Sequence, residues 1–252
     1  MVPLAAQSSP RKKAMTQCPD VALLDFERRL IQEWLPTYCR DPFRNYDVRG
    51  FSGGMRSLSA CDAADFTYSL DKGLVKDMGG GRYRAPRSMA VEVLFWEGLK
   101  AVSPRPITLW LEPVITIAAL GRLHRDYGWP AAYLGLQSAD WAFDLVAYAD
   151  QASAAIKVAC EIKKTSRELM HMIRCLNHFA AEPKAVSKCE KGPDLNAARK
   201  WTALAAARPR LFWAVGPTAE SALFSVTYDE TGPRRFEPVS LEALHFAESP
   251  SA

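Results

Sequence analysis

The apolar and polar positions of the first hundred residues predict short elements. Residues 21–39 have helical spacing of apolar side chains, and we expect this helix to end at Pro36. Residues 57–73 predict one or two short helices, and "GLVKDMGGGRYRAP" predicts a β-hairpin around its Gly-Gly-Gly turn. Residues 89–102 are typical of an apolar helix or another buried segment, and "SPRP" follows them as a boundary.

The pattern is more regular in the rest of the chain. Residues 111–128 predict a helix with Pro113 in its first turn and Gly128 at its end. Three strands follow, "WPAAYLGL", "WAFDLVAY" and "IKVACEIK", and then an amphipathic helix with Ser166 as its N-cap. A short helix over 196–207, the strands "RLFWAVG" and "ALFSVTYD" and a polar tail complete the chain. This order predicts an α/β fold with a mixed central sheet flanked by helices.

Composition narrows the class of protein only slightly. The chain has 252 residues, 48% of them hydrophobic, which suffices for the core of one large or two small domains. The net charge of +4 permits a polyanionic partner without requiring one. Six scattered cysteines without a CxxC pair favour reduced thiols in a cytoplasmic protein over disulfides or a zinc site. Residues 1–20 are expected to form a disordered tail, and we expect no signal peptide or membrane contact.

Two strands carry carboxylates where a buried strand should carry none. Alternation places Glu161 and Lys163 on one face of "IKVACEIK". Asp144 lies inside an otherwise apolar strand, where burying it alone costs several kcal/mol. If the strands pair, Asp144 and Glu161 approach each other, and carboxylates about 4 Å apart repel by about 4 kcal/mol at an effective dielectric of about 20. A divalent cation such as Mg²⁺ or Mn²⁺ removes that repulsion, and a structural ion pair with Lys163 is the alternative.

The order and spacing of these residues resemble the PD-(D/E)XK, or restriction endonuclease-like, nuclease superfamily. The pattern is nearest to Holliday-junction resolvases and related DNA endonucleases, and it covers roughly residues 111–179 plus the later strands. It consists of Glu112 at the start of a helix, "GW", "FD" ending at Asp144, and "EIKK" from Glu161. Phe143 stands where the family name has a proline, and the QxxxY element of RecB-type members is missing.

The resemblance implies a metal site. Asp144, Glu161 and the backbone carbonyl of Ile162 would bind Mg²⁺ or Mn²⁺. Glu112 would bind a second metal or hold a metal-bound water, although an acidic residue also suits the N-terminus of a helix. Lys163 would position the attacking water or stabilise the charge that builds on the phosphate.

The resemblance also implies an activity. We expect a Mg²⁺-dependent phosphodiesterase that cuts DNA without a covalent enzyme intermediate, of the kind found in bacterial defence, transposition or recombination. Lys164 would extend the positive charge along the phosphate path, or it is a solvated strand end. His124 and His171 are not assigned, because no nucleophile motif accompanies them. A homodimer or a protein partner is compatible with the superfamily.

The front half is similar to a winged helix-turn-helix domain. Residues 21–105 would form this small, mainly helical domain, with 106–252 as the nuclease domain. The hairpin would be a wing, and Lys76, Arg82 and Arg84 would contact phosphates. A helical cap that touches no DNA is the alternative. For the whole protein, the alternatives to a DNA endonuclease are a DNA-binding regulator with an inactive nuclease fold and a nuclease that acts on RNA.

Overall fold

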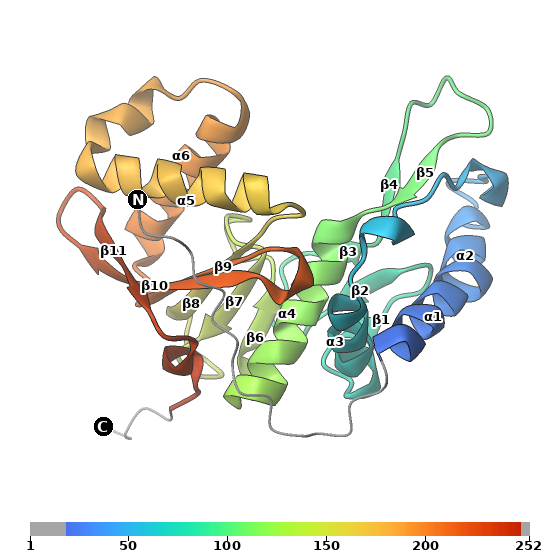
Figure 1. The fold of residues 1–252 in the computed structure, drawn as a ribbon, viewed down its shortest axis with the longest axis horizontal. Coiled ribbons are helices and arrows are strands. Elements are labelled where there is room, and N and C mark those ends of the chain that lie inside the picture. The colour runs from blue at the N-terminus through green and yellow to red at the C-terminus, as the bar shows by residue number, and fades with distance from the viewer. Residues whose placement is uncertain (1–18, 248–252) are drawn as a thin grey trace.

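A six-stranded mixed sheet with helices on both faces forms the centre of the protein, which confirms the α/β class (Figure 1). The computed structural model describes residues 19–247. The strand order is β11-β10-β9-β8-β7-β6, with β8 and β9 parallel and all other neighbours antiparallel. The strands are β6 (Leu134–Leu136), β7 (Leu145–Tyr148), β8 (Ile156–Ile162), β9 (Leu211–Val215), β10 (Ser221–Tyr228) and β11 (Pro233–Val239).

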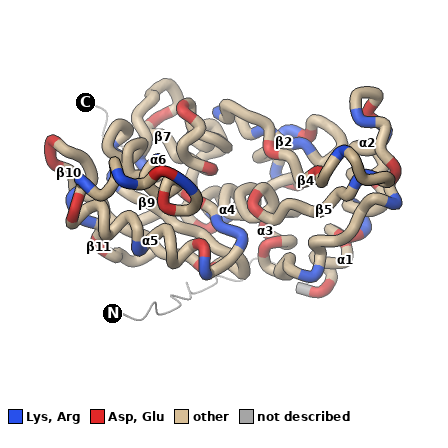
Figure 2. The backbone as a smooth tube through the Cα atoms, turned by 90° about the horizontal axis from the view of Figure 1, so that it is seen from above, with Lys and Arg blue, Asp and Glu red and all other residues tan. Residues whose placement is uncertain are grey.

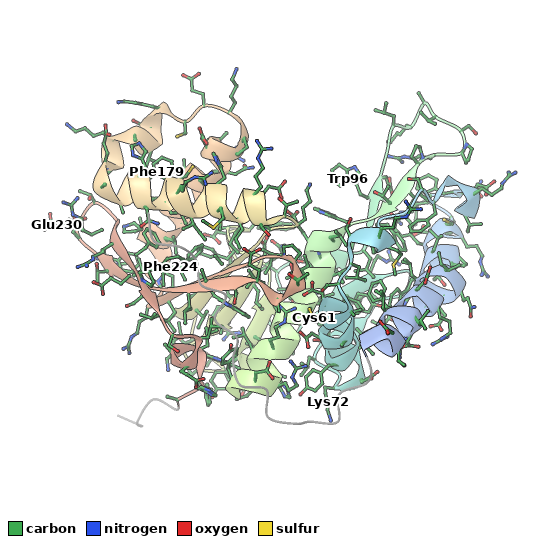
Figure 3. All side chains as sticks on the ribbon, in the orientation of Figure 1. Cys61, Lys72, Trp96, Phe179, Phe224 and Glu230 are labelled. Carbon is green, nitrogen blue, oxygen red and sulfur yellow. The ribbon has the colours of Figure 1, made fainter. Side chains whose placement is uncertain are left out.

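Each face of this sheet has its own apolar cluster. Helices α5 (Ser166–Ala181) and α6 (Gly192–Ala207) pack on one face, where Phe179 and Phe224 are buried (Figure 3). Helix α4 (Leu111–Tyr127) lies on the other face, with α3 (Ala60–Asp71) packed against it. Short 3-10 turns connect the elements at Val48–Gly50, Met55–Ser57, Ala131–Tyr133, Pro183–Lys188, Pro217–Ala219 and Leu241–Leu244. Among the described residues, no helix combines the length and apolar character needed to span a bilayer.

The first helix continues past its proline, contrary to the expectation that Pro36 ends it. Helix α1 (Pro19–Arg29) leads through a π-helical turn (Leu30–Trp34) into α2 (Leu35–Cys39). Pro36 therefore lies in the first turn of α2, where a missing N–H is best tolerated, directly after the wider turn. Of the expected disordered tail 1–20, residues 1–18 lie outside the described residues, and the last two positions begin α1.

The predicted hairpin is confirmed, and the segment after it is extended. Strands β1 (Lys76–Asp77), β2 (Arg82–Arg84) and β3 (Glu92–Val93) form a small antiparallel sheet, and β4 (Phe95–Glu97) pairs with β5 (Ile107–Leu109). The expected helix over 89–102 is therefore absent, and its residues 92–93 and 95–97 form two short strands, because valine and aromatic residues favour pleated pairing. The hairpin turn packs on the protein itself, since a Cβ at Gly80 would lie 3.1 Å from Cα of Tyr38.

One apolar core joins the front elements to the sheet. The cluster on the α4 face runs from Phe26 in α1 through α3 and α4 to Leu244 near the C-terminus. Helices α3 and α4 touch closely, because a Cβ at Gly121 would lie 2.8 Å from the Asp65 carbonyl oxygen. The Ser69 hydroxyl donates to the Ile117 carbonyl oxygen at 2.8 Å across the same contact. The apolar core therefore continues across residue 105, where the sequence analysis placed the boundary between the front domain and the nuclease domain.

Three details of the back half differ from the sequence predictions. Thr165, not Ser166, is the N-cap of α5, because its Oγ1 accepts from the Glu168 N–H at 3.2 Å. Helix α6 begins at Gly192, four positions before the expected residue 196. Strand β11 lies in the expected polar tail, where Phe236 is buried in the cluster under α5 and α6. The ends of α4 are as predicted, with Gly128 in the left-handed region at φ 74°.

Candidate functional site

Asp144 and Glu161 lie on one face at one end of two paired strands. Asp144 directly precedes β7, so it is not inside an eight-residue strand as expected. The register pairs Leu145 with Cys160, and continuing the ladder by one position places Asp144 opposite Glu161. Asp144 Oδ2 accepts a hydrogen bond from the backbone N–H of Ile162 at 2.8 Å. Both side chains are therefore on the face covered by α5 and α6.

Glu161 is a buried carboxylate held by two lysines. Glu161 is 1% exposed. Its Oε1 lies 2.6 Å from Lys163 Nζ, and its Oε2 lies 2.6 Å from Lys200 Nζ. Burial raises the pKa of Glu161, but the two ammonium groups outweigh it and hold the pKa below its usual value. Lys200 extends from α6 and also donates to the Ala142 carbonyl oxygen, which ties this helix to the loop before Asp144.

Asp144 has the opposite electrostatic behaviour. Burial, and after it the charge of Glu161, raises the pKa of Asp144 to about 8. Lys200, Lys163 and the Ile162 N–H offset only part of this increase. The shift favours the protonated form of Asp144 in this arrangement, and an additional positive charge nearby would favour its carboxylate form.

Further acidic groups extend the cluster towards α4. Glu112 is partly buried in the first turn of α4, where the Trp110 indole N–H donates to its Oε2 at 3.2 Å. The charge of Glu112 makes a minor contribution to the raised pKa of Lys163, after the larger contributions of Glu161 and Asp144. Burial, assisted by Glu112, raises the pKa of Glu92 in β3, and Gln137 Nε2 donates to Glu92 Oε1 at 2.9 Å.

Sequence reasoning missed Lys200 and Glu92, although the sequence holds a signal for each. Lys200 falls on the apolar stripe of its helix, between Ala197 and Leu204, where a buried acidic partner is the usual explanation for a lysine. Glu92 is a single acid in the apolar stretch "MAVEVLF", the same anomaly that drew attention to Asp144. Neither signal reveals which partner the charge meets, because the partners are distant in sequence.

The four basic residues expected to contact nucleic acid are divided between two places. Lys164 follows Lys163 at the end of β8, is exposed, and lies 3.9 Å from Glu168. Lys76 and Arg84 are exposed and lie opposite each other in the register of the β1–β2 hairpin. Arg82 donates to the Gly79 carbonyl oxygen at 3.0 Å within that hairpin.

The donor set fits a hard divalent cation. Asp144 and Glu161 offer carboxylate oxygens beside the main chain of Ile162, and such oxygens suit Mg²⁺ or Mn²⁺. Burial, and after it the charge of Glu161, raises the pKa of Asp144, and a cation would offset both effects. Glu161 already contacts two ammonium groups, so a cation must replace one of them as its partner. No protein-family model, curated protein or solved structure matches the chain.

Proposed function

We propose that the protein is a metal-dependent endonuclease that hydrolyses phosphodiester bonds in DNA at the Asp144–Glu161–Lys163 site. One observation carries the proposal: Asp144 and Glu161 face each other across neighbouring strands, and Lys163 Nζ lies 2.6 Å from Glu161. Burial first and the charge of Glu161 second raise the pKa of Asp144, so an ionised Asp144 costs free energy unless a cation accompanies it. It also agrees with the resemblance to PD-(D/E)XK nucleases in the order of Glu112, Asp144, Glu161 and Lys163.

Each side chain has a role in this proposal. Asp144 and Glu161, with the carbonyl of Ile162, would bind Mg²⁺ or Mn²⁺, and Glu112 would hold a second ion or a water. A bound divalent cation supplies Lewis acidity, which polarises a phosphate oxygen and lowers the pKa of a water. Lys163 keeps its proton, because Glu161 and Asp144 outweigh its burial and raise its pKa, so it serves as a cation and not as a base. Its ammonium group would orient the water or stabilise charge on the phosphate.

Lys200 gives the site a replaceable counter-ion. It occupies Oε2 of Glu161 from α6, while Lys163 occupies Oε1 from the same strand as Glu161. Lys163 is fixed two residues from Glu161, so Lys200 is the partner that can move away when a metal binds. We therefore expect metal binding to loosen the contact between Lys200 and the sheet.

A DNA-binding regulator with an inactive nuclease fold is the second candidate. The observation that favours it is the complete pairing of Glu161, whose two oxygens each contact an ammonium group without a metal. Basic and acidic positions are interspersed along both halves of the described chain, so DNA contact would depend on local groups such as Lys163 and Lys164 (Figure 2). A nuclease for RNA would use the same site.

A supercoiled-plasmid nicking assay with Mg²⁺, Mn²⁺ or EDTA tests the proposal. We expect metal-dependent nicking by the wild type and its loss in Asp144→Asn and Lys163→Ala. Lys188→Ala is a matched control, since Lys188 is exposed and lies 4.0 Å from Glu182, outside the site. Cleavage that ignores both site substitutions would end the assignment. Binding without cleavage in every metal would favour the regulator, and cleavage of single-stranded RNA alone would favour the third candidate.

A further inference from the structure

A second cluster of ligand-type side chains lies outside the proposed nuclease site, where α5 meets the start of α6. His171 and Cys175 are one helical turn apart on α5, and Asp194 is in the first turn of α6. Their ligand atoms all lie within 4.8 Å of one another, and no other group of three such residues does so among residues 19–247. A metal ion can reach all three side chains from solvent, because His171 and Cys175 are only partly buried and Asp194 is exposed.

The arrangement does not fit a nucleophilic Cys-His-Asp triad. In such a triad the histidine uses one ring nitrogen for the nucleophile and the other for the carboxylate. Here the same atom, His171 Nε2, lies 2.7 Å from Asp194 Oδ1 and 3.5 Å from Cys175 Sγ. Burial and Asp194 also raise the pKa of Cys175 to about 11, whereas a reactive thiol has a lowered pKa. The three atoms converge on one point instead of forming a relay.

Convergence on one point is what a metal ion requires. Zinc binds thiolate at about 2.3 Å and imidazole nitrogen or carboxylate oxygen at about 2.0–2.2 Å, so tetrahedral ligand atoms lie about 3.4–3.6 Å apart. The Cys175 Sγ distances to His171 Nε2 and Asp194 Oδ1 are 3.5 and 3.6 Å, which already match. Only the His171–Asp194 pair, at 2.7 Å, must separate by about 0.7 Å.

We propose that His171 Nε2, Cys175 Sγ and Asp194 Oδ1 form a zinc-binding site that links α5 to α6. Nitrogen, sulfur and oxygen together suit Zn²⁺, whereas the oxygen-only set at Asp144 and Glu161 suits Mg²⁺. The zinc site takes three protein ligands and leaves one position for water. Because it connects the two helices that cover the Glu161 face of the sheet, zinc would stabilise this helical layer. The proposal does not depend on the nuclease activity.

Titration with Co²⁺ as a spectroscopic substitute for Zn²⁺ tests the site in the full-length protein. The protein is kept reduced with a phosphine, which adds no thiol ligand. We expect one equivalent to bind, with a thiolate-to-cobalt band in the near ultraviolet and visible bands as intense as tetrahedral coordination gives. Zinc should then displace the cobalt and raise the melting temperature.

Matched variants identify the ligands. Cys175→Ser and His171→Ala should each weaken zinc binding by more than about 100-fold. Substituting a residue that only supports a metal ligand typically lowers the affinity by about 10- to 100-fold. Cys61→Ser and His178→Ala should bind as the wild type does, because neither side chain is in the cluster. Asp144→Asn should also leave zinc binding intact, which separates this result from the nuclease proposal. Circular dichroism confirms that each variant is folded.

Two results would overturn the assignment. The first is a cobalt complex without a thiolate band, or no complex at micromolar metal. The second is a thiolate band that persists in Cys175→Ser and disappears in Cys189→Ser. Cys189 is the neighbouring thiol, and its Sγ contacts the Ala185 carbonyl oxygen at 3.5 Å, outside the cluster.

Discussion

The protein contains two ionic clusters of different character. The first joins α3 and α4, where Arg122 contacts Asp62 and Asp65, and Arg125 Nη1 lies 2.7 Å from Asp65 Oδ1. The second is the candidate site. There Lys163 and Lys200 contact Glu161, and the pKa of Asp144 is raised. Both lie deep in the fold, and each has two cationic side chains.

The difference lies in how the acidic side chains are paired. In the helix cluster Asp62 and Asp65 each contact a guanidinium group, and Arg125 also contacts Asp126. In the candidate site Glu161 contacts both ammonium groups, whereas Asp144 Oδ2 accepts from the Ile162 N–H, and burial followed by the charge of Glu161 raises the pKa of Asp144. Direct pairing of carboxylates with cations is typical of structure, whereas a buried carboxylate that is costly to ionise is typical of a site for a cation.

The largest effect of a single substitution on stability is expected in the helix cluster. Arg122→Ala leaves Asp62 and Asp65 buried without their main partner, so the free energy of unfolding should fall by about 3–5 kcal/mol. Urea denaturation measures the change. Replacing Arg122 by Met together with Asp62→Asn and Asp65→Asn should recover part of the loss, because no isolated charge remains. A loss of less than about 1 kcal/mol in Arg122→Ala would place this cluster among surface ion pairs.

The next largest effect concerns catalysis at the candidate site. Asp144→Asn and Lys163→Ala should each lower the single-turnover rate of plasmid nicking by roughly 100-fold or more, because each removes a charge that acts on the reacting phosphate. Asp144→Asn should not lower the free energy of unfolding at pH 8, since it removes a carboxyl that is costly to ionise there. A variant that unfolds instead of losing its rate would make the site structural, like the Arg122 cluster.

Lys200 allows a direct comparison of the two clusters. Lys200→Met leaves Glu161 Oε2 without its cation, so we expect a loss of about 1–3 kcal/mol in stability at neutral pH. Millimolar Mg²⁺ should restore more of the loss in Lys200→Met than in Arg122→Ala, because Asp65 keeps Arg125 and Asp62 keeps the Thr218 N–H as partners in the second variant. Thermal denaturation with Mg²⁺ and with EDTA measures both. Equal responses of the two variants to Mg²⁺ would contradict the distinction between the clusters.

The last prediction is a pH dependence. The pKa of Asp144 is about 8 in the folded protein and about 4 when unfolded, so the folded state binds more protons between these values. The contribution of Asp144 to stability should therefore fall as pH rises from about 4 to about 8 and stay constant above. Subtracting the unfolding curve of Asp144→Asn isolates it. Parallel curves for the two proteins over this window would show that Asp144 titrates normally.

Sequence patterns predicted the elements whose side chains repeat regularly. The apolar stripe of α5 and the alternation in β8 specified those elements, and alternation placed Glu161 on one face with Lys163. Strand β7 was predicted, but its late start at Leu145 was not, because Gln137 and Trp141 adopt positive φ in the preceding loop without a glycine to signal it. Strand β11 was missed because it is a polar edge strand with few buried positions.

The site itself was only half visible in the sequence. The sequence predicted that Asp144 and Glu161 approach each other if their strands pair, and β7, which directly follows Asp144, does pair with β8, which contains Glu161. Lys200 reaches Glu161 from another layer, and Gln137 reaches Glu92 from another sheet. Those contacts depend on how helices and sheets pack, which periodicity within one element does not encode.

The parallel pairing of β8 with β9 has a consequence for how this protein can change. One uninterrupted stretch of chain between the adjacent strands β8 and β9 forms the helical layer over the Glu161 face of the sheet. This layer includes α5, α6, Lys200 and the His171 cluster. A single insertion, deletion or exchange within residues 164–210 would therefore change the helical layer while every strand keeps its neighbours. Asp144 and Glu161 would keep their positions on the sheet whichever helices cover them.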